Sequence, residues 1–359
     1  MSIPRATDKL ARLVEEHWAE LKDTEDIDEV RLLRRRLQRF QSLIPLFSEF
    51  NDEEIWEAIQ GKRAGGQGKG PAEDLKPPEW EVFPNPDSAA DFKLKRVAQP
   101  KGFENFFEDT VLVERIREVR ALLGFTRIES NADFAEATVL KDGRLTKLCR
   151  ESPNWLPASE VRGEGIFLRL RETSFLAWAG KPELQHLEQE FFDAHKAWRR
   201  FRNLQPVHEG FPGIRLVLLH SLAHALMRQI VLDCGYTAAS VRERLYSRHP
   251  GEEGGPMAGI LLYTAAPDSE GTLGGLVELG EPLTLGRHLQ QALESMRLCG
   301  SDPLCSEHRP DDTLGRGVHG ACCHACRFSP ETSCERSNRY LDRSTLVNTF
   351  SARGTAFFE

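Results

Sequence analysis

The stretch HGACCHACRFSPETSC, residues 319–334, contains four cysteines and two histidines. Thiols and imidazoles this close together can form disulfides, hold a metal ion or act as nucleophiles. Six of the chain's eight cysteines lie in one window, residues 299–334. This clustering predicts a shared task for these side chains, and their spacing favours a metal site.

Cys323 and Cys326 form a CxxC knuckle, whose short turn lets both sulfurs reach one ion. A tetrahedral zinc site needs four ligands, with Zn–S bonds of about 2.3 Å. Cys322 is expected to point away from the knuckle. Five cysteines have suitable spacing for the four places: Cys299, Cys305, Cys323, Cys326 and Cys334. We favour Cys305, Cys323, Cys326 and Cys334, with Cys299 as the first replacement and His308 and His324 as further substitutes.

The compartment also favours zinc over disulfides. The N-terminus shows no apolar signal core, and no apolar run approaches the roughly 18–20 residues that span a bilayer. We therefore expect a cytoplasmic protein with no membrane contact, in which thiols stay reduced. Four thiolates close the coordination shell, so we expect a structural zinc that cross-links a loop-rich segment. Scattered buried thiols and a redox or nucleophilic role are the alternatives.

The sequence HSLAH places His220 and His224 one turn apart on one face of a predicted helix. Metalloproteases use this spacing with a glutamate in between, but the intervening residues here are Ser221, Leu222 and Ala223. In this strongly apolar helix the two rings are interpreted as core or interface histidines with hydrogen-bonded neighbours. The rival hypothesis is a metal-dependent nuclease built around them and nearby carboxylates.

Two basic stretches fit contact with DNA phosphates, and the second also offers aromatic rings for stacking. The candidate contacts are Arg34 and Arg35 in RLLRRRLQRF, and Lys196, Arg199, Arg200 and Arg202 in HKAWRRFR. A solvated face with acidic neighbours is the alternative for each. The Gly-rich loop PDSEGTLGGLVELGE is either a tight packing turn or a contact for nucleic acid or a partner. A net charge of -8 argues against coating nucleic acid overall, but permits a local basic stripe.

The elements that must position these residues predict a mixed α/β protein. We expect a helical N-terminal region over residues 1–60, a linker and irregular segment over 61–109, an α/β core domain over 110–298 and a zinc-binding subdomain over 299–359. Within the core, helices are expected at 109–124, 182–202, 213–235, 238–247 and 285–298, and strands at 166–170 and 259–266. There is no P-loop or convincing dinucleotide fingerprint, so no nucleotide hydrolysis is expected.

Six blocks in order carry a family resemblance. They are LPASEVRGEGIFLRL, HSLAHALMRQIVLDCGY, SVRERLY, GILLYTAAPDSEGTLGGLV, CGSDPLC and CCHACRFSPETSCERSNRYLDR. Together, over roughly residues 110–345, they resemble the DrmB-like component of the DISARM bacterial antiphage systems. The zinc-binding module is also similar to the C-terminal domain of Mrf-type DNA-repair helicases. The family's cysteine pattern falls on the same five cysteines and leaves open which four bind.

The resemblance implies a non-catalytic role beside a superfamily-two helicase-like ATPase, with the pair engaging phage DNA. This chain would hold the helicase, shape a DNA path and carry a structural zinc. DrmB-like proteins are usually longer, with extra N-terminal sequence, and residues 1–100 here match nothing familiar. The chain is either a compact variant or part of a related defence system. A stand-alone DNA sensor and the nuclease are the alternative functions.

Overall fold

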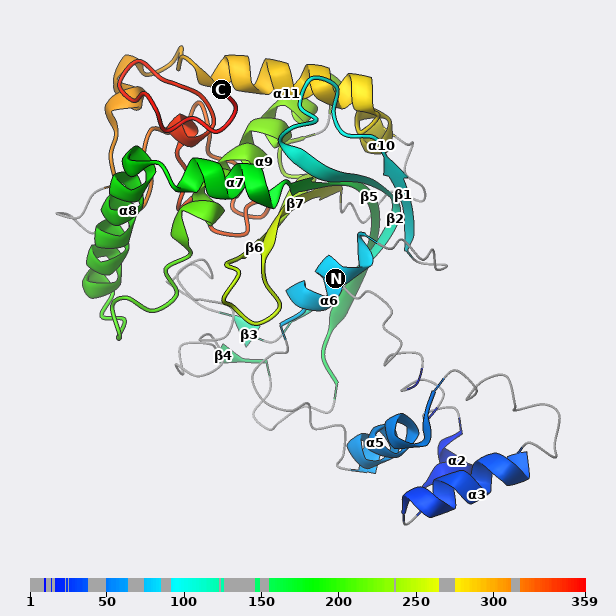
Figure 1. Ribbon diagram of the computed structural model, residues 1–359. Coiled ribbons are helices and arrows are strands. Elements are labelled where there is room, and N and C mark those ends of the chain that lie inside the picture. Colours follow the sequence, from blue (N-terminus) through cyan, green and yellow to red (C-terminus); the bar gives the residue numbers. More distant parts are fainter. Residues whose placement is uncertain are drawn as a thin grey trace. The chain divides into compact units, whose positions relative to one another are not determined.

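The computed structural model (Figure 1) divides the chain into two compact units, residues 2–78 and 79–359. The structure describes residues 10, 14, 17–22, 24, 26–37, 50–63, 74–84, 92–122, 124–125, 146–148, 155–235, 237–264, 275–310 and 317–359. The Gly-rich segments at 64–73 and 265–274, which the sequence marked as linker and loop, lie outside this set.

The smaller unit is helical. It contains α2 (Trp18–Leu21), α3 (Ile27–Leu37) and α5 (Asp52–Arg63), which enclose a core of Leu10, Val14, Leu21, Val30, Phe50, Ile55 and Ile59. A reciprocal capping box starts α5, because the Glu54 amide donates to Asn51 Oδ1 and the Asn51 amide donates to Glu54 Oε2, each at 2.8 Å. Asn51 is therefore the N-cap of α5.

The larger unit is built on a five-stranded antiparallel sheet in the order β1-β2-β5-β7-β6. Its strands are β1 (Lys93–Val97), β2 (Phe107–Ala121), β5 (Ala158–Leu170), β6 (Val241–Arg248) and β7 (Met257–Thr264). A small ribbon pairs β3 (Gly124–Phe125) with β4 (Thr146–Lys147). The helices are α6 (Lys76–Val82), α7 (Glu172–Ala179), α8 (Pro182–Phe201), α9 (Gly213–Cys234), α10 (Gly275–Leu279) and α11 (Pro282–Met296).

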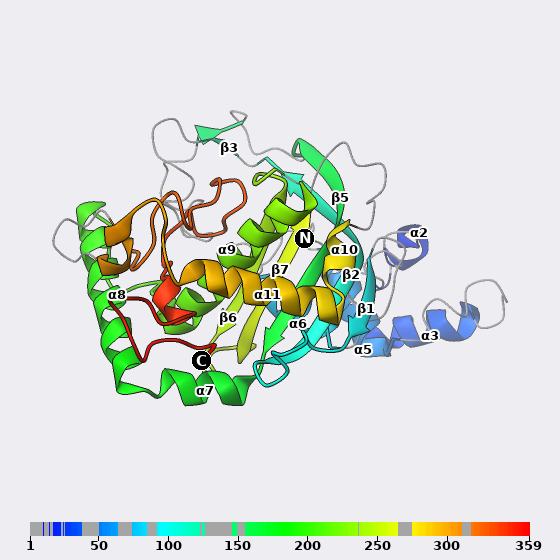
Figure 2. The ribbon, with the colours of Figure 1, turned by 90° about the horizontal axis from the view of Figure 1, so that it is seen from above.

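Both faces of the sheet are covered. The buried helix α9 packs across β6 and β7, and α8 and α11 pack against α9 (Figures 1 and 2). On β5, Ile166 and Leu168 enter this core, whereas Phe167 points to the other face. There Phe83 stacks on Phe167 with ring centroids 3.8 Å apart, and Trp80 meets it edge-on at 5.6 Å. The mixed α/β fold predicted from the sequence is confirmed.

The predictions of α8, α9, α11, β5 and β7 are confirmed, and α9 ends at Gly235 in the left-handed conformation, with φ 69°. Among the described residues, one helical stretch, Gly213–Asp233, is long and apolar enough to cross a membrane. However, 72% of its apolar window is buried inside the protein, as expected for a core helix.

Two predicted helices are strands. Residues 109–124 lie largely in β2, where the pairing with β5 shifts register between Val113 and Ile116. This bulge places two buried apolar residues three positions apart, which imitates helical spacing. Residues 238–247 contain β6, where Val241, Glu243 and Leu245 are buried in alternation. Because Glu243 is charged, the sequence does not show the alternating apolar pattern of a strand here.

Within the described part of the segment expected to be irregular, residues 61–109, two complete regular elements add to the sheet layer. Helix α6 supplies Trp80 to the sheet, and β1 pairs along β2. The short run KLKRV lacks the apolar pattern of a strand, because only Leu94 is buried and the edge position leaves the charged side chains in solvent. Pairing with β2, rather than propensity, makes it a strand.

The buried His195 on α8 predicts a pH dependence of stability. Burial lowers its pKa from 6.5 to about 4, while its ring contacts the Tyr340 hydroxyl at 2.7 Å. The unfolded chain therefore takes up this proton at a higher pH than the folded chain. The free energy of unfolding should therefore fall by up to about 3 kcal/mol as the pH drops from about 6.5 to about 4. Urea unfolding of wild type and His195→Gln measures it, since only the variant lacks this contribution. The exposed His186→Gln on the same helix should keep the wild-type slope.

Candidate metal centre

The described parts of the C-terminal segment, residues 297–310 and 317–359, have little regular structure and lie against one face of α9. Its helical turns are the 3-10 helices η2 (Pro303–Glu307) and η3 (Arg343–Thr345). Polar groups of α9 hold it: Ser221 Oγ accepts from the Asp342 amide at 2.8 Å. Arg228 donates to the Ala325 carbonyl at 2.7 Å. A segment with so few backbone ladders needs other cross-links.

Four cysteines of this segment converge on one point. The ligand atoms of Cys299, Cys305, Cys323 and Cys326 all lie within 4.8 Å of one another. The Sγ atoms of Cys299 and Cys323 are 3.7 Å apart, and Cys305 and Cys323 each lie 3.6 Å from Cys326. The backbone amide of Cys323 also donates to Cys326 Sγ, at 3.3 Å.

These separations fit a zinc ion and exclude disulfides in this structure. A disulfide holds its sulfurs about 2.05 Å apart, well below the separations here, and all four cysteines are free. In a tetrahedron with Zn–S bonds of about 2.3 Å, neighbouring sulfurs lie about 3.8 Å apart. Three of the six sulfur–sulfur separations are therefore already close to those of a zinc site, and none exceeds 4.8 Å. As four protein ligands, the thiols would close its coordination shell.

Charge around the cluster also fits a metal–thiolate group. Four thiolates and one Zn²⁺ carry a net charge of about -2. Arg327 and Arg343, each 2% exposed, are buried nearby and interact electrostatically with Cys326 and Cys305 respectively. Among the described residues, no nitrogen of the Arg327 guanidinium has a hydrogen-bond partner. An anionic metal cluster supplies the counter-charge that such a buried guanidinium needs.

The structure does not bring all five predicted cysteines together. Cys299 completes the group of four, and Cys334, a member of the set favoured from the sequence, lies elsewhere. Neither substitute histidine joins: His308 contacts the Cys322 carbonyl at 3.2 Å, and His324 is exposed. Cys322 is buried apart from the group, with its Sγ 3.5 Å from the Leu341 carbonyl. Spacing along the chain could not show whether Cys299 or Cys334 is the fourth member, because the path of the loops in space decides which cysteine reaches the other three.

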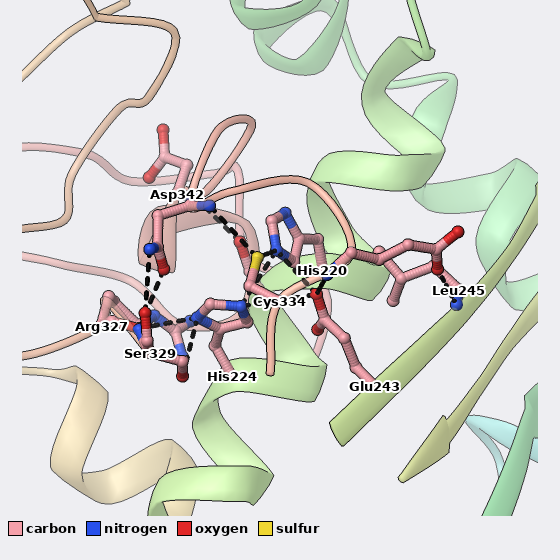
Figure 3. A network of polar contacts seen from close by, with 11 residues as sticks. His220, His224, Glu243, Leu245, Arg327, Ser329, Cys334 and Asp342 are labelled. Carbon is pink, nitrogen blue, oxygen red and sulfur yellow. Dashed lines mark hydrogen bonds and ion pairs between the residues drawn. The ribbon is translucent and has the colours of Figure 1, made fainter. Parts of the chain in front are cut away.

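Cys334 instead meets His220, His224 and Glu243 in a second buried group (Figure 3). Burial lowers the pKa of His220. Burial alone would raise the pKa of Glu243, but the two histidines outweigh it and hold the pKa well below its usual value. Burial raises the pKa of Cys334 far above its usual value. The sequence analysis missed Glu243 because it expected a helix at 238–247. Only in a strand does Glu243 share the buried face with Val241 and Leu245.

The predicted DNA contacts have different environments. Arg34 and Arg35 lie on α3, but their side chains are outside the described set. On α8, Lys196 pairs with Asp193 at 2.7 Å, and Arg199, 12% exposed, pairs with Glu209 at 3.3 Å. Arg200 is exposed, and the Arg202 guanidinium stacks 4.8 Å from the Trp198 ring centroid. The basic stretch is therefore part structural and part solvent-facing.

Comparison with known proteins agrees with this geometry. Residues 222–327 match the family described as MZB, the MrfA Zn-binding domain, and this range contains all four clustered cysteines. Over 290 residues, 79% of the chain, the sequence is 35% identical to the DISARM protein DrmB of Bacillus paralicheniformis (strain ATCC 9945a / NCIMB 11709 / CD-2). This chain is DrmB-like. The DrmB-like chain carries a structural zinc, and it spans about half, 49%, of the length of that curated relative.

The cysteine geometry predicts unequal effects of neighbouring substitutions. Cys323→Ser should remove one zinc per chain and reduce soluble yield, because three ligands remain and the loop loses its cross-link. Cys322→Ser is the matched control, since it removes an adjacent buried thiol outside both groups, and it should keep the full zinc content. Native mass spectrometry of the purified variants gives the count. Full zinc content in a folded Cys323→Ser, Cys326→Ser double variant would contradict the assignment.

The burial of the Arg327 guanidinium near the cysteines predicts that its charge strengthens zinc binding. Arg327→Gln should weaken zinc binding on the order of tenfold or more, since outer-shell groups tune metal affinity on that scale. Competition with a chromophoric chelator measures the dissociation constant. Arg353→Gln removes an exposed cation from the same segment and should leave the constant unchanged. Equal zinc affinity of the Arg327 variant and wild type would show that the guanidinium is not a counter-charge.

Proposed function

We propose that this chain is a non-catalytic, DNA-contacting subunit of a bacterial antiphage defence complex. It works in the cytoplasm as the partner of a superfamily-two helicase-like ATPase. The observation that carries the proposal is the 35% identity to a DISARM protein DrmB over 79% of this chain. The zinc-binding domain of the MrfA type supports the link to helicases. The division into four regions made from the sequence stays a prediction.

A non-catalytic role is supported by the two groups of metal-ligating side chains found in the described part of the chain. Four thiolates leave no open position on zinc for a water or substrate. The nuclease hypothesis depends on His220 and His224, but these side chains are 0% and 1% exposed, and Glu243 is 5% exposed. A DNA phosphate cannot reach a group buried to that degree unless the core opens.

DNA contact is best supported at the C-terminal end of α8. Arg200 is exposed and Phe201 is 59% exposed. The Arg202 guanidinium lies 4.8 Å from the Trp198 ring centroid and 5.9 Å from the Phe201 ring centroid. An exposed ring beside cations suits an unpaired base and its phosphate. Lys196 and Arg199 contribute less, because acidic partners already neutralise them.

The experiment for the partner role is native mass spectrometry of the chain co-expressed with the helicase-like ATPase encoded beside it. We expect a heteromer that retains zinc and whose ATPase activity responds to DNA. A monomer that binds DNA tightly without the ATPase would instead support the stand-alone sensor. Strand cleavage by the isolated chain, abolished in a folded His224→Ala variant, would support the nuclease.

The surface on α8 predicts a local effect on DNA binding. The double variant Arg200→Glu, Phe201→Ala should weaken binding of the complex to single-stranded DNA roughly tenfold or more, because it removes a phosphate contact and a stacking ring. Arg287→Glu is a matched control, since it reverses an exposed charge on α11. Fluorescence anisotropy at two salt concentrations measures both variants. Equal losses in the two would show that overall charge, rather than this surface, sets the affinity.

A further inference from the structure

We propose that His220, His224, Glu243 and Cys334 form a second zinc site. It is separate from the four-cysteine group, because no residue belongs to both. All four side chains are buried, with exposures of 0%, 1%, 5% and 7% respectively. The predicted ligand is Zn²⁺, because a mixed set of imidazole, carboxylate and thiolate ligands suits that ion.

The donor atoms already lie at ligand spacing (Figure 3). His220 Nε2 is 3.0 Å from His224 Nε2, and 3.1 Å from both Cys334 Sγ and Glu243 Oε1. The distance from His224 Nε2 to Glu243 Oε1 is 3.6 Å. Tetrahedral zinc with bonds of about 2.0–2.3 Å separates its ligand atoms by about 3.3–3.8 Å. Binding therefore needs the group to open by only a few tenths of an ångström.

A contact outside the group orients the His224 lone pair inward. His224 Nδ1 lies 2.7 Å from the Arg327 carbonyl, which can only accept, so the neutral ring carries its proton there. This leaves the Nε2 lone pair facing the group, as in metal-bound histidines whose other nitrogen donates to a carbonyl. The hydrogen bonds and ion pairs described for the His220 ring also all involve Nε2.

The thiol and the carboxylate are held in the same way. The backbone N–H of Asn338 donates to Cys334 Sγ at 3.1 Å, and the backbone N–H of Glu335 donates to Glu243 Oε1 at 3.0 Å. Ser337 and Asn338 adopt left-handed conformations, with φ 53° and 59°, which non-glycine residues rarely take. The turn after Cys334 thus accepts backbone strain and aims an amide at the sulfur.

Hydrogen bonding alone accounts poorly for this packing. With the His224 proton on Nδ1 and Glu243 ionised, at most two protons lie between the four ligand atoms, one from His220 and one from Cys334. Lone pairs of nitrogen, oxygen and sulfur would then face one another inside a low-dielectric core, which is unfavourable. One divalent cation removes this repulsion for every pair at once.

The site would tie together three elements of the chain. Its ligands come from α9, from β6 and from the turn that follows Ser333. Four protein ligands and complete burial make it a closed, structural site rather than a catalytic one. The C-terminal segment would then be fastened within itself by the four-cysteine group and to the sheet layer by this second ion.

The test on the unmodified full-length chain combines a metal count with zinc X-ray absorption. We expect two zinc ions per chain by native mass spectrometry after desalting. We also expect an average shell of about two and a half sulfurs per zinc, from one all-sulfur and one mixed site. One zinc per chain with an all-sulfur shell would overturn the proposal. This measurement needs no variant, so it does not depend on any variant folding.

Variants then assign the two ions. Cys334→Ser and His224→Gln should each leave one zinc with an all-sulfur shell, whereas Cys323→Ser should leave one zinc with a mixed shell. His195→Gln is the matched control, because it replaces another buried, hydrogen-bonded histidine, and should keep two ions. Two zinc ions in folded Cys334→Ser and His224→Gln proteins would overturn the assignment. Neither outcome depends on the helicase or DNA, so the proposed function stands or falls separately.

Discussion

The fold depends on one constraint: a C-terminal segment with little regular secondary structure must be attached to the buried helix α9. The described residues of this segment, 297–310 and 317–359, form few backbone ladders, yet the main core includes Tyr340, Leu346, Val347 and Phe357. Apolar burial is non-directional and does not by itself choose one path for an irregular chain. Directional contacts must do so, and α9 supplies them through His220, Ser221, His224 and Arg228, spaced along the face that meets the segment.

This constraint explains why so many charged and polar groups are buried. Arg327 and Arg343 lie beside the cysteines, and Glu243 lies within reach of two histidines. Each would be unfavourable alone in a low-dielectric interior. Beside metal ions the two arginines act as counter-charges and Glu243 acts as a ligand, so the metal sites account for the burial of these charged groups. Arg327 links the two groups, since its side chain interacts with the thiols and its carbonyl accepts from His224.

Local pattern predicted the long elements well. The periodicity of α8 and α11 and the apolar length of α9 were sufficient, and so was Gly235 as the end of α9. Local pattern failed at β2, where a bulge imitates helical spacing, and at β6, where Glu243 occupies a core position. The partner that decides β2 is β5, and the partners that make a core position suitable for Glu243 are His220 and His224. Neither lies within the short window of sequence from which an element is predicted.

For the sites, the chemistry was readable from the sequence alone. Clustered cysteines around a CxxC knuckle favoured zinc, because few other tasks need several thiols so close together. Which thiols lie together was decided only by the tertiary structure. Cys334 is 114 residues from His220 along the chain, yet their donor atoms are 3.1 Å apart. Ligand sets follow distances in space, and the length of a loop does not reveal where the fold places its ends.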